Sequence, residues 1–449
     1  MSGVLLVRNC GRLVTMDGAG RVLRDGWLVA RDGFIESLGS GAPPEVTGAD
    51  VIDAGGGLAL PGLVNTHHHM YQNLARAYTP IASLPLLPWL AGLTPLWRSF
   101  TADDLHTASL VAMAELMLTG CTTTSDHHYV FPAGAGPLID AQFAAAAELG
   151  LRFHGARGAM DTASDLIPAW AVQPLEAILR DAERLADRYH DPARGAMTRL
   201  VLAPCALTSG SVDLYRETAA IARRRGLHLH THCAETVAEN DLTVARFGSR
   251  PLQRLEDLGW DNARVWFAHG IHFDDAEISR LGRLRMGVAH CPCSNMRLGS
   301  GCCRVADLQR AGASVGLGVD GSASNDSGHM LNEARQALLL ARVFRGADAM
   351  TPTDALALAT TGGARVLGRE DLGSLEPGKC ADLALFPASD LFSSGAENPV
   401  DALVLCFPRQ VRTLIIHGRV RVRDGAIPGL DLPALLARHA RIARRITGG

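Results

Sequence analysis

The sequence repeats one local pattern, a short apolar or β-branched run followed by a longer stretch rich in Ala, Leu and Arg, and this repetition limits the possible folds more than any other feature. Eight such runs occur within residues 57–373: LALPGLVNT, CTTTSDH, LRFHGARG, RLVLAPC, LHLHTHCAE, RVWFAHG, RMGVAHC and SVGLGVDG. The stretches between them space apolar residues three and four apart, as helices do. Eight alternating strand and helix units favour parallel strands and predict an α/β fold, a (β/α)8 TIM-like barrel of about 250 residues or more.

Both ends of the chain follow a different pattern. Residues 1–56 and 374–430 contain short alternating strands separated by Asp-Gly and His-Gly turns. Since neither segment has enough strands to bury a core alone, we expect the two to form one small β-sandwich domain beside the barrel of residues 57–373. Residues 431–449 include PALLARHARIARRI, whose spacing predicts a C-terminal amphipathic helix.

Composition excludes several classes of function. The chain of 449 residues has a formal net charge of −3 and a pI near 6.6, which leaves no basic field for nucleic acid. The sequence has neither an apolar run of about 18 residues for a membrane span nor a signal peptide, and its ten cysteines show no regular disulfide framework, so we expect a cytoplasmic protein. Lys379 is the only lysine, so a Walker A loop, a pyridoxal Schiff base and a lysine bridging two metals lack a residue in the right setting.

Polar residues gather at the predicted carboxyl ends of four strands. These ends read Asn65-Thr66-His67-His68-His69 after strand one, His230-Thr231-His232-Cys233-Ala234-Glu235 after strand five, Ala268-His269-Gly270 after strand six and Val319-Asp320-Gly321 after strand eight. The active site of a parallel barrel lies at this end, so the four strands deliver these side chains to one rim. Residues i and i+2 of a strand project to the same side, so His67 and His69 can share a metal while His68 points away.

The residue types at this rim suit one catalytic divalent metal. Zn2+ takes imidazole nitrogens plus a carboxylate and keeps one position for water. Fe2+ accepts the same ligands. Asp320 supplies the carboxylate, and a histidine of strand five completes the set with His67 and His69. The pattern alone does not decide between His230 and His232.

Taken together, these motifs resemble the amidohydrolase superfamily, specifically its branch of single-metal aminohydrolases. The resemblance covers nearly the whole chain and rests on His-x-His after strand one, His-x-x-Glu after strand five, a histidine after strand six, an aspartate after strand eight, and GSLEPGKCADLALF near the C-terminus. It implies a metal-dependent hydrolase of C–N bonds in cyclic amidines. It also implies that His232, rather than His230, is the ligand that joins His67, His69 and Asp320.

Within this branch the sequence resembles the 8-oxoguanine deaminases most, through stretches such as NTHHHMYQNLARAY, HTHCAET and GLGVDGSASNDS. This resemblance implies a small heterocyclic substrate and the conversion of 8-oxoguanine to urate and ammonia. Isoxanthopterin and guanine deaminases share several stretches, as do s-triazine hydrolases of the hydroxydechloroatrazine ethylaminohydrolase type, which release an amine or chloride. Some triazine hydrolases replace the strand-eight aspartate, so the presence of Asp320 favours deamination. A binuclear hydrolase would need a lysine that strand four lacks, and an inactive scaffold would have lost ligands.

The predicted roles follow from the residue types. We expect Asp320 to accept a proton from the attacking water and pass it to the leaving amine, His269 to hold the hydroxide, and Glu235 to protonate the adjacent ring nitrogen. By resemblance, Gln72 binds the purine edge with an amide that both donates and accepts. Arg157 is expected to meet a ring carbonyl of the substrate, with a structural salt bridge as the alternative.

Residues after strand two complete the predicted rim. Asp126 and His127 are candidates for orienting a ligand histidine, and Trp97, His128 and Tyr129 for lining the pocket. For the assembly, we expect a homodimer, the commonest closed oligomer.

Overall fold

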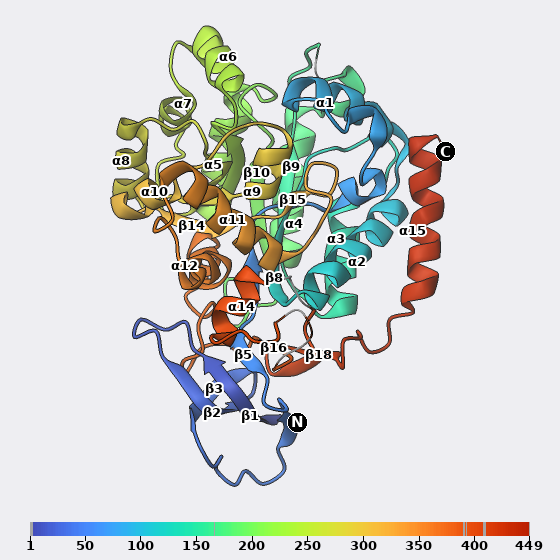
Figure 1. Ribbon diagram of the computed structural model, residues 1–449. Helices are drawn as coiled ribbons and strands as arrows, with labels where there is room; N and C mark the ends of the chain where they lie inside the picture. Colours follow the sequence, from blue (N-terminus) through green and yellow to red (C-terminus); the bar gives the residue numbers. More distant parts are fainter. Residues whose placement is uncertain (1–2, 166, 389–390, 392, 407–409, 449) are drawn as a thin grey trace.

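The structure is a computed structural model that describes residues 3–165, 167–388, 391, 393–406 and 410–448 (Figure 1). The predicted domains also include residues 1–2, 166, 389–390, 392, 407–409 and 449, which lie outside the described residues.

Eight parallel strands form the predicted barrel. They are β6 (Leu63–Asn65), β8 (Cys121–His128), β9 (Arg152–Ala159), β10 (Thr198–Pro204), β11 (His228–Cys233), β12 (Val265–His269), β13 (Gly287–His290) and β14 (Ser314–Leu317). The Thr66 N–H donates to the Leu317 carbonyl at 2.9 Å, which draws β6 and β14 together. Beyond them β7 (His68–His69) pairs with β15 (Asp320–Gly321), so the continuations of strands one and eight reach the rim side by side.

Helices surround the barrel (Figure 1). In chain order they are α1 (Leu86–Leu93), α2 (Ala102–Leu118), α3 (Leu138–Leu149), α4 (Leu175–Tyr189), α5 (Val212–Arg225), α6 (Val237–Phe247), α7 (Pro251–Asp257), α8 (Asp275–Leu284), α9 (Pro292–Arg297), α10 (Val305–Ala311), α11 (Met330–Arg345), α12 (Pro352–Ala357), α13 (Gly363–Val366), α14 (Pro399–Leu405) and α15 (Leu432–Thr447). Local sequence signals set their ends. For α5, the Ser211 hydroxyl accepts the Leu214 N–H at the start, and Gly226 adopts a left-handed conformation at the end.

Both ends of the chain meet in one mixed sheet of eight strands. The sheet contains β1 (Val4–Val14), β2 (Val22–Arg31), β3 (Phe34–Ser40), β4 (Asp50–Asp53), β5 (Leu58–Pro61), β16 (Leu383–Phe386), β17 (Thr413–Ile416) and β18 (Arg419–Arg423), in the order β18-β17-β16-β5-β1-β2-β3 with β4 beside β1. The predicted first barrel strand is therefore divided, because β5 pairs with β1 and β16 and only β6 enters the barrel. Gly62 links them where a Cβ would lie only 2.1 Å from the Thr122 hydroxyl.

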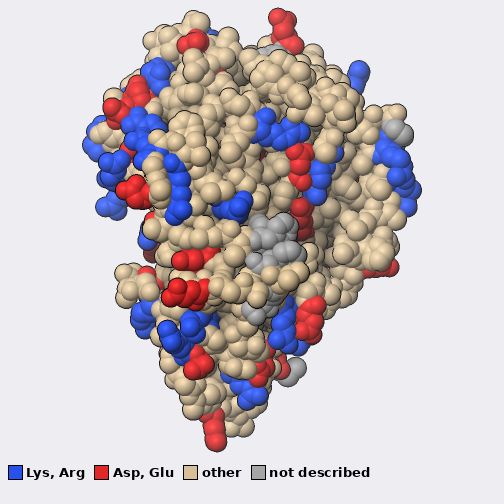
Figure 2. All heavy atoms as spheres, in the orientation of Figure 1, with Lys and Arg blue, Asp and Glu red and all other residues tan. Residues whose placement is uncertain are grey.

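Apolar side chains fill the spaces inside and around the barrel. One buried cluster packs the barrel strands against helix α13 and consists of Val64, Ala156, Val201, Ala203, Trp266, Ala289, Val366 and Leu367. Helix α15 lies along α2 at the edge of the molecule, buries Ile442 and Ile446, and places a ring nitrogen of His439 2.9 Å from Asn73 Oδ1 (Figure 1). Among the described helices, none combines the length and hydrophobicity needed to cross a bilayer. Figure 2 shows acidic and basic side chains interspersed on one face.

Candidate active site and metal centre

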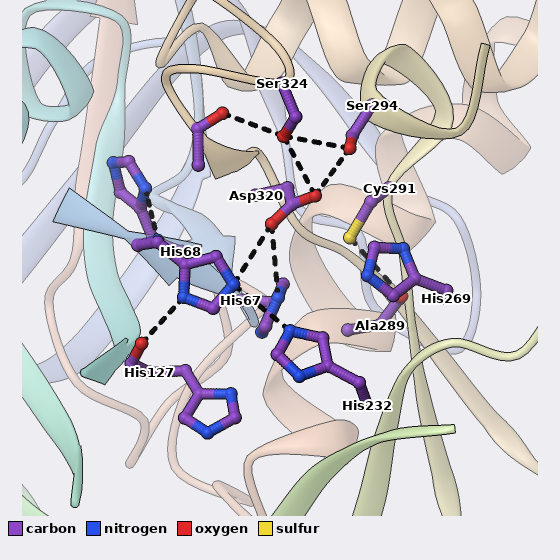
Figure 3. Close-up of polar contacts among 12 residues, drawn as sticks. His67, His68, His127, His232, His269, Ala289, Cys291, Ser294, Asp320 and Ser324 are labelled. Carbon is purple, nitrogen blue, oxygen red and sulfur yellow. Dashed lines mark hydrogen bonds and ion pairs between the residues drawn. The ribbon is translucent and has the colours of Figure 1, made fainter. Parts of the chain in front are cut away.

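Three histidines and one aspartate converge at the carboxyl end of the barrel (Figure 3). The Nε2 atoms of His69 and His232 lie 3.1 Å apart. Asp320 Oδ1 lies 3.3 Å from His67 Nε2 and 3.4 Å from His69 Nε2. The structure thus brings together the four residues predicted to bind a metal, and their donor atoms face one another.

The protonation of these histidines suits metal binding. Burial lowers the pKa of His67 and His69, and lowers the pKa of His232 to about 3, so the rings are neutral. His69 Nδ1 lies 2.6 Å from the His127 carbonyl, and His232 Nδ1 lies 2.7 Å from the Cys205 carbonyl. A carbonyl only accepts, so each Nδ1 carries the proton and each Nε2 keeps its lone pair.

An unsatisfied atom within the cluster supports the same conclusion. His67 Nε2 is buried and has no hydrogen-bond partner among the described residues. Lone pairs of neutral imidazoles cannot satisfy one another, whereas a cation between them would satisfy all of them. Three imidazoles and a carboxylate are a typical donor set for a borderline divalent metal, so the residues present fit one such ion.

Asp320 is held so that one oxygen faces the histidines. Its other oxygen, Oδ2, accepts hydrogen bonds from the hydroxyls of Ser294 at 2.5 Å and Ser324 at 3.2 Å. Burial acts to raise the pKa of Asp320, but the neighbouring His67 and His269 outweigh it and hold the pKa well below its usual range. Asp320 is therefore a carboxylate.

Glu235 and His269 face each other next to the cluster. His269 Nε2 lies 3.5 Å from Glu235 Oε2, and His269 Nδ1 lies 2.9 Å from Asn295 Oδ1. Burial raises the pKa of Glu235 to about 7, so this side chain can carry and donate a proton near neutral pH. Both His269 and Asp320 have left-handed backbone angles, with φ of 71° and 58°, conformations that are uncommon for such residues and that turn the chain sharply at the rim.

The cluster opens into a cavity of about 150 Å3. Its polar lining includes Gln72, Glu235, His269 and Asp320, and its apolar lining includes Trp89, Leu90, Leu93, Trp97, Met160 and Leu298. Gln72 Oε1 is buried without a hydrogen-bond partner among the described residues. It fits beside the backbone only because residue 321 is Gly, where a Cβ would lie 1.7 Å from that oxygen. A planar heterocycle with polar edges suits such a cavity.

His128, a predicted pocket residue, is not among the residues that line this cavity. Arg157, a predicted substrate contact, does not line it either. It lines a separate cavity, where its guanidinium lies 3.2 Å from Asp181 and 3.0 Å from Gln173 Oε1 and stacks 4.3 Å from the Phe131 ring. These contacts correspond to the structural salt bridge considered as the alternative. His68 points away from the cluster, and its Nδ1 accepts the N–H of His69 at 2.9 Å.

The sequence interpretation missed the groups that hold Asp320 and His269 in place. Ser294 and Asn295 are neighbours in α9, and each hydrogen-bonds a different site residue, Asp320 and His269. Both follow a barrel strand in HCPCSN, and polar residues at that end of a strand were the available signal. For strand two, the His127 carbonyl contacts His69, whereas Asp126 accepts the Met70 N–H at 2.6 Å. Tyr129 and Trp97 line the cavity.

Comparison with known proteins agrees with this geometry. Residues 58–421 match the model of the amidohydrolase family. The chain belongs to this family. It is 47% identical to 8-oxoguanine deaminase from Pseudomonas aeruginosa over 99% of both chains. It is also 37% identical to hydroxydechloroatrazine ethylaminohydrolase from Pseudomonas sp. strain ADP, over 98% of this chain and 95% of the relative. Among family members of known structure, atrazine chlorohydrolase from Arthrobacter aurescens complexed with zinc superposes with a TM-score of 0.93, at 30% identity over 98% of this chain and 100% of the other. The predictions of a metal-dependent hydrolase of this family and of a barrel fold are confirmed.

Proposed function

We propose that this chain is a hydrolytic deaminase of a purine-like heterocycle, and that it converts 8-oxoguanine to urate and ammonia. The observation that carries the proposal is the arrangement of three proton-handling side chains, Glu235, His269 and Asp320, in the polar lining of a cavity that also contains the histidine cluster. The choice of 8-oxoguanine rests on the 47% identity to the Pseudomonas aeruginosa deaminase over the whole chain.

His67, His69, His232 and Asp320 would hold one divalent metal, zinc in the first place, because their donor atoms converge and the three rings are neutral. Zinc, when bound there, supplies a Lewis acid that lowers the pKa of water to about 7.

The side chains of this protein would then move the protons. Asp320 is ionised and accepts a proton from the attacking water. Glu235 carries a proton and donates it to the ring nitrogen beside the reacting carbon, which makes that carbon more electrophilic. His269, fixed by Asn295, faces Glu235 at 3.5 Å and orients the attacking oxygen between the two carboxyl groups. Asp320 finally gives its proton to the amino group, which leaves as ammonia, and the proton left on the attacking oxygen returns to Glu235 as the ring carbonyl forms.

Gln72 would recognise the edge of the ring. Its unpartnered Oε1 can accept a ring N–H, and its amide can donate to a ring nitrogen or carbonyl. The apolar lining would cover the flat face of the heterocycle and exclude water. Because Arg157 already has Asp181 and Gln173 as partners in another cavity, we assign it a structural role.

A triazine amino- or chlorohydrolase is the second candidate. The 37% identical ethylaminohydrolase and the 30% identical chlorohydrolase structure favour it, since both cover nearly the whole chain. The two candidates share the metal centre and differ in the ring that the cavity accepts.

Ammonia release from protein of known metal content tests the proposal. The substrates are 8-oxoguanine, guanine, isocytosine, isoxanthopterin, adenine, cytosine and a hydroxylated aminotriazine. We expect the highest kcat/KM for 8-oxoguanine with about one metal per chain. Turnover of the triazine without turnover of any purine would replace the proposed substrate by the second candidate. A homodimer, a cytoplasmic location and the absence of a nucleic-acid partner stay predictions from the sequence.

A further inference from the structure

Strand β11 carries a histidine, His230, that contacts the proposed ligand His67 but is not itself in the proposed ligand set. The ring is fully buried. Its Nε2 lies 2.8 Å from Nδ1 of His67, and its Nδ1 lies 3.0 Å from the carbonyl oxygen of Trp266. It also stacks on the indole of Trp266, with ring centroids 4.7 Å apart and planes inclined by 20°.

These contacts fix the position of every proton on the two rings. The Trp266 carbonyl only accepts, so His230 Nδ1 carries a proton. A neutral imidazole carries one proton, so with that proton on Nδ1 the Nε2 of His230 keeps a lone pair. That lone pair accepts the proton of His67 Nδ1. The lone pair of His67 is therefore on Nε2, the atom that lies 3.3 Å from Asp320 Oδ1.

The same contacts decide a question that the sequence left open. Both ring nitrogens of His230 are engaged, one with His67 and one with Trp266, so His230 has no lone pair left for a metal. His232, two residues later, has its Nε2 3.1 Å from His69 Nε2. His232 therefore faces the proposed metal position, whereas His230 lies behind it and contacts His67.

His67 differs from the other two histidines in how it is held. Backbone carbonyls of His127 and Cys205 orient His69 and His232, and no substitution removes a carbonyl. Among the described residues, the hydrogen-bond partner of His67 Nδ1 is a side chain, that of His230. We propose that His230 is a positioning residue that fixes the tautomer and direction of His67 and thereby sets the affinity of the centre for a divalent metal. The inference rests on the proposed ligand set.

Zinc affinity of the purified full chain tests this inference. The metal is first removed, and Zn2+ binding is then measured by competition with a chromophoric chelator for wild type, His230→Leu and His230→Gln. Leucine has a similar volume but no acceptor, so we expect affinity to fall about 10- to 100-fold, the usual effect of removing a group that orients a ligand. The Oε1 of glutamine can reach His67 as Nε2 does, so we expect His230→Gln to bind within about threefold of wild type.

Matched controls separate orientation from packing. His228 is two residues away on the same strand, and we expect His228→Leu and His228→Gln to keep wild-type zinc affinity. The thermal midpoint of each metal-free variant reports folding. If His230→Leu does not fold, His230→Asn replaces it. The asparagine amide stays near the Trp266 carbonyl but is too short to reach His67, so we expect the same loss of zinc affinity.

Two results would overturn the inference. Wild-type zinc affinity in His230→Leu would mean that His67 needs no partner. Equal losses in the Gln and Leu variants would mean that stacking on Trp266, and not the hydrogen bond, is what matters. If the wild-type chain itself bound no zinc, the proposed ligand set would fail, and this inference with it.

Discussion

Two sets of buried polar side chains at opposite ends of the barrel differ in their hydrogen bonding. At the carboxyl end, His67 Nε2, Gln72 Oε1 and Asn295 Nδ2 are buried without hydrogen-bond partners among the described residues. At the amino end, Arg152 and Arg369 are almost fully buried, yet all of their nitrogens have partners.

The amino-end network joins the barrel to the mixed sheet. Arg152 begins β9 and binds Asp382, which directly precedes β16, at 3.1 Å. Arg369 holds both oxygens of Asp371 at 2.8 Å. An unpaired buried polar group costs roughly 1–3 kcal/mol. The paired nitrogens of Arg152 and Arg369 therefore stabilise the fold, whereas the unpaired atoms of His67, Gln72 and Asn295 lie where a bound ligand could satisfy them.

Removing a ligand histidine should have the largest effect. We expect His67→Ala to lose zinc and to lower kcat by more than about 10⁴-fold, because the attacking water is no longer activated. Metal analysis and ammonia release measure both. Full activity in a variant that contains no zinc would remove the metal from the account.

Removing the proton of Glu235 should have the next largest effect. We expect Glu235→Gln to lower kcat by about 10²–10⁴-fold, since the amide cannot protonate the ring nitrogen, and to keep zinc at the wild-type level. Steady-state ammonia release and metal content are measured on one preparation. Near-normal turnover with zinc bound would contradict the role of Glu235 as the acid.

Breaking the amino-end network should affect stability instead. Asp382→Ala leaves Arg152 buried without its carboxylate, and we expect the free energy of unfolding to fall by about 3–5 kcal/mol in chemical denaturation, with unchanged zinc affinity. The control is Asp213→Ala, which removes an exposed ion pair with Arg216 and should cost less than about 1 kcal/mol. Equal losses in the two variants would remove the distinction between the ends.

Acid should weaken the same network, with the smallest effect. Burial acts to raise the pKa of Asp371, but Arg369 outweighs it and holds the pKa well below its usual value. A lowered pKa in the folded state stabilises the protein above the unfolded pKa near 3.9, and that stabilisation is lost as pH falls below it. We expect the difference in unfolding free energy between wild type and Asp371→Asn to shrink below about pH 4, by at most about 1.4 kcal/mol per pH unit. Urea denaturation at pH 3.5, 4 and 6 measures this difference in unfolding free energy. A difference that stays constant with pH would contradict a lowered pKa of Asp371 in the folded protein.

The sequence predicted the parts of the molecule that depend on local periodicity. Eight apolar runs became the barrel strands, and the two-residue period of strand one placed His67 and His69 together with His68 facing away. It assigned Leu58–Pro61 to the wrong sheet, because an apolar run does not reveal which strands it will pair with.

The supporting contacts of the site lay beyond local patterns. Ser294 reaches Asp320 across 26 positions of the chain, and His230 reaches His67 across 163. The left-handed backbone at His269 turns its ring toward Glu235, and no periodic pattern in the sequence predicts such a turn. Such contacts depend on how distant elements pack, which the hydrophobic pattern constrains only loosely.

The most direct test of the central claim is a zinc titration of metal-free protein, with ammonia release from 8-oxoguanine measured at each step. We expect no release without zinc, a linear rise to about one Zn2+ per chain, and a plateau beyond it. Release without zinc, or a rise that continues to two equivalents, would contradict a single metal centre built from His67, His69, His232 and Asp320.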